Sequence, residues 1–162
     1  MVGSDAPVAT QPASVDAAAP TSQLTEAARG LVRVARMLEH AATELTLPQY
    51  RLLVMVAGGD QRASTLAGRL ALSKPTVTAV VDGLVERGFL IRTEASGDRR
   101  AVDLSLTPAG YDTLRATDAA MGARLAWILA HCDDPMAVEA TLAQLGTAMS
   151  KVVAAKVAGT AK

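Results

Sequence analysis

Residues 63–88 read ASTLAGRLALSKPTVTAVVDGLVERG, and this stretch predicts the fold at the middle of the chain. Ser64 is suited to cap a short helix that runs through Leu70, and Ser73 is suited to cap a second helix that begins at Lys74. Only Ala-Leu-Ser separates the two expected helices. Helices joined by so short a turn are typical of a helix-turn-helix, and we expect that motif here.

The second of these helices has two different faces. Apolar residues recur at helical spacing and predict a buried stripe that consists of Val77, Val80, Val81, Leu84 and Val85. Lys74, Thr78 and Asp82 share the outward face, and Thr76 lies on its exposed flank. Gly88 is well placed to end the helix.

A hairpin is expected directly after this helix. Two β-prone runs, FLIRTE at residues 89–94 and AVDLSL at residues 101–106, enclose the segment ASGDRR, whose Gly97 suits a turn. The tightest cluster of charge in the chain, which includes Arg99 and Arg100, therefore falls near the tip of a two-stranded wing.

Helical patterns flank this centre on both sides. A first helix is expected over residues 23–42, and a second from residue 47, with Thr46 as its cap and Gly58-Gly59 at its end. Beyond the hairpin, Thr107 and Pro108 begin a long helix that reaches residue 132, and a last helix covers residues 136–157. The fold class is therefore mainly α with a small β-hairpin wing.

Composition limits the remaining alternatives. The 162 residues include one Trp, two Tyr and one Phe, so Ala, Leu and Val must fill the core, which disfavours an all-β fold. The net charge is zero, so nucleic-acid binding would depend on a local patch. Cys132 is the only cysteine, which excludes an intrachain disulfide and suits a reducing cytosol. No signal peptide or membrane span is visible, and we expect a cytoplasmic protein.

An enzyme is not expected. His40, His131 and Cys132 are the only imidazole and thiol groups, and the adjacent His131 and Cys132 would point about 100° apart on a helix. We identify no catalytic residue, no cofactor and no metal site, because no paired spacing of ligands is present.

The middle of the chain resembles the MarR family of bacterial winged helix-turn-helix transcription regulators. The resemblance is carried by LTLPQYRLLVMVA at residues 45–57 and by residues 63–110. The most specific signature is Asp98-Arg99-Arg100, followed by Leu106-Thr107 and then Gly110. The resemblance implies a homodimer that binds a palindromic operator, usually represses, and is often released by a small ligand. It also implies that residues 46–107 are the DNA-binding domain. The helical regions 23–45 and 108–158 would then form the dimerisation region, preceded by a disordered tail at residues 1–22.

Several side chains are candidates for contact with double-stranded DNA. Ser73, Lys74, Thr76 and Thr78 present hydroxyls and one ammonium near a helix N-terminus, which suits phosphates and base edges. Ser73 could equally serve only as a cap. Arg99 is the first candidate for insertion into the minor groove. The full expected set is Ser73, Lys74, Thr76, Thr78, Arg92, Asp98, Arg99 and Arg100.

Asp98 would hold an arginine of the tip, with Arg100 as its partner unless Arg100 contacts the DNA backbone. Ala79 and Gly83 stand where relatives commonly carry arginine. The alternative is therefore a winged-helix module that binds proteins and has weak or lost DNA binding.

The outer helices are too apolar to be covered by one small winged helix, and we expect them to interleave with a second copy. The residues concerned are Leu24, Leu31, Leu38, Leu125, Trp127, Ile128, Leu129, Val138, Leu142, Leu145, Met149, Val152 and Val153. The resemblance also implies a ligand cleft where these helices meet the winged helix. Its candidate lining is His40, Tyr50, Arg51, Met55 and Tyr111, and Arg51 favours a phenol or an aromatic acid.

Overall fold

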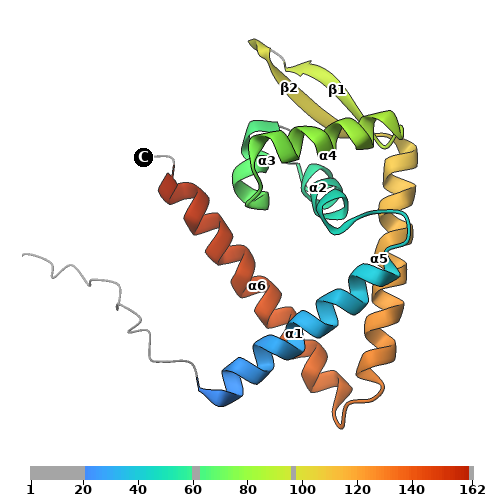
Figure 1. Cartoon of the computed structure of the whole chain (residues 1–162), viewed down its shortest axis with the longest axis vertical. Coiled ribbons are helices and arrows are strands. Elements are labelled where there is room, and N and C mark those ends of the chain that lie inside the picture. Colours follow the sequence, from blue (N-terminus) through green and yellow to red (C-terminus); the bar gives the residue numbers. More distant parts are fainter. Residues whose placement is uncertain (1–20, 60–62, 96–97, 161–162) are drawn as a thin grey trace, which may run out of the picture. The chain divides into compact units, whose positions relative to one another are not determined.

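The computed structural model describes residues 21–59, 63–95 and 98–160 and confirms a mainly helical fold with one hairpin (Figure 1). In chain order the elements are α1 (Ser22–Ala41), α2 (Leu47–Ala57), α3 (Ala63–Leu70), α4 (Lys74–Glu86), β1 (Leu90–Ala95), β2 (Asp98–Leu106), α5 (Pro108–Leu129) and α6 (Pro135–Thr160). The chain divides after Val34 into two units, and every element from α2 onward belongs to the second. None of the helices in the described ranges is long and apolar enough to cross a membrane.

The core lies among α2, α3, α4 and the hairpin, with a contribution from α5. Leucine dominates it, as the scarcity of aromatic residues implies. Among the residues that the structure describes, the largest fully buried side chains are Leu52, Leu53, Leu66, Leu70, Leu84, Leu90 and Leu104. These elements therefore form one packed winged helix-turn-helix, which fixes α4 and the hairpin relative to each other.

Local signals in the sequence set several helix ends. Ser73 caps α4, because its Oγ accepts a hydrogen bond from the backbone N–H of Thr76 at 3.3 Å. Thr107 caps α5 in the same way and accepts from the N–H of Gly110 at 3.0 Å. Thr46 precedes α2, and its backbone N–H donates to Oε1 of Gln49 at 3.0 Å. Three of the four predicted caps, Thr46, Ser73 and Thr107, are confirmed in position.

Some other predicted boundaries were wrong. The third helix begins at Ala63, so Ser64 lies within it instead of capping it. The end of α2 was predicted correctly, because this helix stops at Ala57 and the chain leaves it at Gly58 and Gly59. Helix α5 ends at Leu129, short of Cys132. The expected tail at residues 1–22 and the turn at Gly97 lie outside the described residues, apart from the start of α1 at Ser22.

The hairpin differs from the prediction at its tip. Strand β2 begins at Asp98, three residues before the predicted start. The antiparallel register runs regularly from Leu90↔Leu106 to Glu94↔Val102, and the next pair is Ala95↔Asp98. The backbone of residues 99–101 is therefore extra length on β2, as in a β-bulge. The sequence pattern missed this irregularity because a polar run without alternation reads as a loop.

Candidate nucleic-acid interface

Helix α4 turns one face into the core and the other to solvent, as the sequence predicts. Val77, Val81 and Leu84 are buried, and Val80 and Val85 are half-buried. On the opposite side the exposed residues include Lys74, Thr76, Thr78, Ala79 and Asp82. The hairpin lies beside this helix (Figure 1). An exposed helix next to a wing is the geometry with which winged helices enter a major groove.

The polar groups at the start of α4 form hydrogen bonds with one another. Oγ of Ser73 and Oγ1 of Thr76 are 2.7 Å apart, and Oγ1 of Thr78 donates to the carbonyl oxygen of Lys74 at 3.1 Å. The Lys74 ammonium makes no ion pair with any residue in the described ranges. The helix N-terminus therefore presents hydroxyl oxygens, one unpaired cation and the positive end of the helix dipole, a combination that suits a phosphate.

Arg92 projects from β1 and forms an ion pair with Asp82 of α4. Both side chains are partly exposed, at 43% and 55%. The sequence grouped Asp82 with Lys74 and Thr78 on the outward face of the helix but did not pair it with Arg92. Nothing local could have shown this contact, because it depends on how the hairpin folds back on the helix.

The three charged residues of the wing signature open β2. The backbone of Asp98 pairs with Ala95, and Arg99 and Arg100 fall in the irregular stretch of the register. The side chains of these three residues lie outside the described part of the structure.

The base of the wing is joined tightly to α5. The hydroxyl of Thr107 donates to the carbonyl oxygen of Gly88 at 2.6 Å, and its backbone N–H donates to that of Phe89 at 3.1 Å. Gly88 has a φ of +72°, which favours glycine there. A Cβ atom at position 110 would lie 2.1 Å from the carbonyl oxygen of Phe89. The signature Thr107-x-x-Gly110 is thus a requirement of this close junction.

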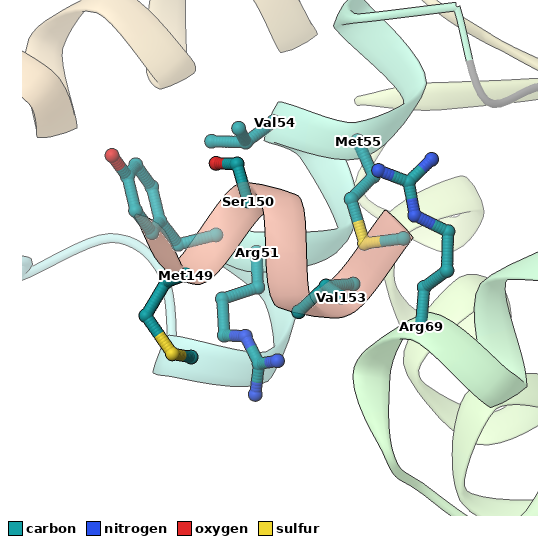
Figure 2. Close-up of a pocket in the computed structure, with 8 residues that line it drawn as sticks. Arg51, Val54, Met55, Arg69, Met149, Ser150 and Val153 are labelled. Atoms are coloured by element: carbon teal, nitrogen blue, oxygen red, sulfur yellow. The ribbon is translucent and has the colours of Figure 1, made fainter. Parts of the chain in front are cut away.

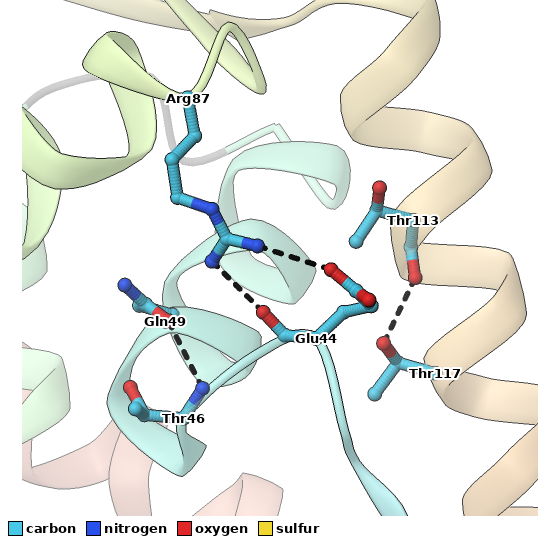
Figure 3. A network of polar contacts seen from close by, with 6 residues as sticks. All are labelled: Glu44, Thr46, Gln49, Arg87, Thr113 and Thr117. Carbon is cyan, nitrogen blue, oxygen red and sulfur yellow. Dashed lines mark hydrogen bonds and ion pairs between the residues drawn. The ribbon is translucent and has the colours of Figure 1, made fainter.

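A second junction, which the sequence did not reveal, lies at the C-terminal end of α4 (Figure 3). The guanidinium of Arg87 donates to the backbone carbonyl oxygen of Glu44 at 2.8 Å and to its Oε2 at 3.2 Å. It also lies over the ring of Phe89, 4.6 Å from the centroid. Arg87 therefore ties the segment before α2 to the start of the wing.

A cavity of about 300 Å³ brings together three of the five ligand candidates (Figure 2). Tyr50, Arg51 and Met55 of α2 line it, together with Val54, Arg69 of α3 and, from α6, Met149, Ser150 and Val153. Arg51 makes no ion pair with any residue that the structure describes. The cavity is thus apolar on several sides with cations at its edge. The part played by α6 was missed, since no local signal connects it with α2.

The other two candidates lie elsewhere. His40 lines a separate cavity of about 420 Å³ with Thr43, Arg124 and Trp127 among its neighbours. Its Nδ1 donates to the carbonyl oxygen of Arg36 at 2.7 Å. Tyr111 is exposed in the first turn of α5 and lines neither cavity. The five residues expected to line one cleft therefore lie at three different places in the structure.

Tyr50 connects the first cavity with α5. Its hydroxyl donates to Oδ1 of Asp118 at 2.8 Å. Burial, together with the hydrogen bond to Asp118 and the charge of that carboxylate, raises the pKa of Tyr50 to about 12. The phenol is therefore neutral at physiological pH and remains a donor to α5.

Comparisons with known proteins agree with this geometry. The model of the MarR family matches residues 43–101. The fold is shared with the transcriptional repressor CouR bound to a 23-mer DNA duplex, which is 23% identical; the match covers 86% of this chain and 99% of that chain, with a TM-score of 0.66. The PcaV transcriptional regulator from Streptomyces coelicolor, in complex with its natural ligand, is 24% identical over 86% and 98% of the two chains, with a TM-score of 0.62.

A probable transcriptional regulator from Pseudomonas aeruginosa is 26% identical over 76% of this chain and 97% of that chain, with a TM-score of 0.59. No curated protein matches the sequence. The family match covers α2, the helix-turn-helix and β1, and the structural matches cover a larger share of the chain.

Proposed function

Residues 43–101 form a MarR-family domain, and from this premise we propose that the chain is a transcription regulator that binds double-stranded DNA. The observation that carries the proposal is the exposed N-terminal face of α4 beside the wing. Ser73, Lys74, Thr76 and Thr78 contact phosphates and base edges in the major groove. Arg99 enters the adjacent minor groove, and Asp98 and Arg100 fix the tip or contact the backbone.

The active species is a homodimer. Several large apolar side chains of the outer helices are exposed in the single chain, among them Trp127 at 54%, Met149 at 57% and Val152 at 62%. Leu129 is buried within the chain and needs no second copy, unlike the expectation from the sequence. A two-fold dimer presents two α4 helices about 34–36 Å apart, and its operator is therefore an inverted repeat. Occupation of such a site represses transcription.

A small phenol or aromatic acid releases the operator. The cavity lined by Tyr50, Arg51 and Met55 offers a cation beside thioether and aliphatic surface, which suits a phenol or an aromatic acid. The solved structure of PcaV holds a natural ligand, so the shared fold can accept one. For release, the compound must bind the DNA-incompetent arrangement more tightly than the competent one, by about 1–3 kcal/mol.

The decisive experiment is selection of duplexes from a random-sequence pool by the full chain, followed by footprinting of the enriched site. We expect an inverted repeat, binding that falls steeply with salt, and loss of binding in the Arg99→Ala/Arg100→Ala double variant. Sedimentation at micromolar concentration should give a dimer. A chain that binds no duplex even at low salt would instead support a winged-helix module for protein interaction.

A further inference from the structure

The ion pair between Arg92 and Asp82 links the wing to the exposed face of α4. We infer that Arg92 influences DNA binding through Asp82, as a positioning residue that holds the wing on α4 and neutralises a carboxylate there. This inference rests on the proposed function, because it concerns the surface that would meet DNA. It replaces the expectation that Arg92 itself contacts DNA.

The register of the hairpin shows which way Arg92 points. Arg92 lies opposite Leu104, and Leu90 lies opposite Leu106. Residues directly opposite, and those two apart on one strand, share a face of an antiparallel pair. The three leucines are buried, so this is the face turned toward the helices. Arg92 therefore rises from the inner face of the wing, where its guanidinium meets Asp82.

The position of Asp82 explains why the contact matters for binding. Asp82 follows Thr78 by four residues and Lys74 by eight, so all three lie on one exposed face of α4. A bare carboxylate on this face would repel the phosphates of a duplex. The guanidinium of Arg92 cancels that charge. Since both side chains are partly exposed, the pair contributes little to folding, and its effect should appear in DNA affinity.

The position along the hairpin supports the second part of the role. The base of the wing is already fixed by the buried leucines and by the hydrogen bonds of Thr107 to Gly88 and Phe89. Arg92 lies further toward the tip, beyond Leu90, where the chain has no other ion pair to α4 among the described residues. The pair therefore restricts the angle at which the tip reaches the duplex.

The test is a double-mutant cycle in the full chain with Arg92→Met, Asp82→Asn and the combined variant. The probe is a duplex that the wild-type chain enriches from a random-sequence pool, and affinity is measured across a range of salt concentrations. The combined variant keeps the net charge of the wild type. Arg92→Met alone should weaken binding about tenfold, because Asp82 is left unpaired. The combined variant should recover most of the loss and keep the wild-type salt slope.

A direct phosphate contact by Arg92 would give a different result and overturn the inference. Arg92→Met would then cost as much affinity in the Asp82→Asn background as in the wild-type background, and the salt slope would fall by about 0.9 per chain. The control is the exposed pair Asp112 and Arg115 within α5, where the equivalent variants should leave affinity unchanged.

Hydrogen exchange of the amides of residues 90–93 in the free protein gives a second readout. Exchange should become faster when either partner is replaced, and unchanged exchange in both single variants would refute the positioning role. A wild-type chain that binds no duplex refutes the proposed function and this inference with it. Equal losses in both backgrounds refute the inference alone.

Discussion

Replacement of Gly110 by alanine should separate the wing from α5. The added Cβ would lie 2.1 Å from the carbonyl oxygen of Phe89 and 3.0 Å from its carbonyl carbon. A carbon and a carbonyl oxygen normally approach to about 3.3 Å, so backbone must move by about an ångström. This movement would stretch the hydrogen bonds that Thr107 makes to Phe89 and Gly88 at 3.1 and 2.6 Å.

The expected cost follows from these contacts. Two weakened hydrogen bonds cost about 1 kcal/mol each, and overpacking of a buried site adds about 1–3 kcal/mol. We therefore expect Gly110→Ala to lower the free energy of unfolding by about 3 kcal/mol and the melting temperature by about 6–12 °C. Thermal and urea unfolding followed by circular dichroism would measure both quantities.

The matched control is Gly83→Ala in α4, where a Cβ would meet nothing within 4 Å. Alanine is the better helix former by about 1 kcal/mol, so this variant should be as stable as the wild type or more so. If the melting temperature of Gly110→Ala equals or exceeds that of the wild type, as expected for Gly83→Ala, then the Thr107–Gly110 junction is not a close backbone contact.

Three other substitutions test the two remaining joints and the turn between α3 and α4. Tyr50→Phe removes the hydrogen bond to Asp118 and should cost about 1 kcal/mol. Since the folded-state pKa of Tyr50 is raised to about 12 from 10.0, wild-type stability should be intact below pH 10 and fall between pH 10 and 12. The stability of Tyr50→Phe should fall less over this pH range. An identical pH profile in the variant and the wild type would contradict the assignment of this fall to Tyr50. Arg87→Met removes two hydrogen bonds to Glu44 and should cost about 1–3 kcal/mol, against less than about 1 kcal/mol for Arg115→Met in an exposed pair; equal losses would count against the joint. Ala71 has a φ of +54°, so Ala71→Gly should raise the urea midpoint by an amount equivalent to about 0.5–1 kcal/mol, and a lowered midpoint would show that the turn is not strained.

Features that depend on neighbouring residues could be predicted from the sequence. The caps at Ser73 and Thr107 depend on a hydroxyl within three residues of an amide, and the buried stripe of α4 depends on helical spacing. Both were predicted for that reason. These two signals are local and need no knowledge of packing. The grouping of Tyr50, Arg51 and Met55 came instead from the resemblance, and these three line one cavity without His40 and Tyr111.

Contacts between distant segments could not be predicted in this way. Arg87 and Glu44 are 43 residues apart, and their pairing depends on where α4 ends relative to the segment before α2. Met149 and Val153 line the cavity because of the path that α6 takes. Arg92 pairs with Asp82 because of the way the hairpin packs on α4. In each case the residue types were visible, but their partners were set by tertiary packing.

The three joints constrain how a ligand could act on DNA binding. Thr107 and Gly110 fix the wing to the first turn of α5, Arg87 fixes the end of α4 to the segment before α2, and Tyr50 fixes α2 to Asp118 further along α5. Helix α5 is therefore attached to the winged helix-turn-helix by hydrogen bonds at two separate points of its length, and Leu114 packs in the core between them. Two attachments resist rotation of α5 against this domain better than one. A ligand beside Tyr50 acts at only one of the two hydrogen-bonded points, so displacement of the Tyr50 hydroxyl would release Asp118 while the Thr107 junction and the packing of Leu114 hold the first half of α5 in place.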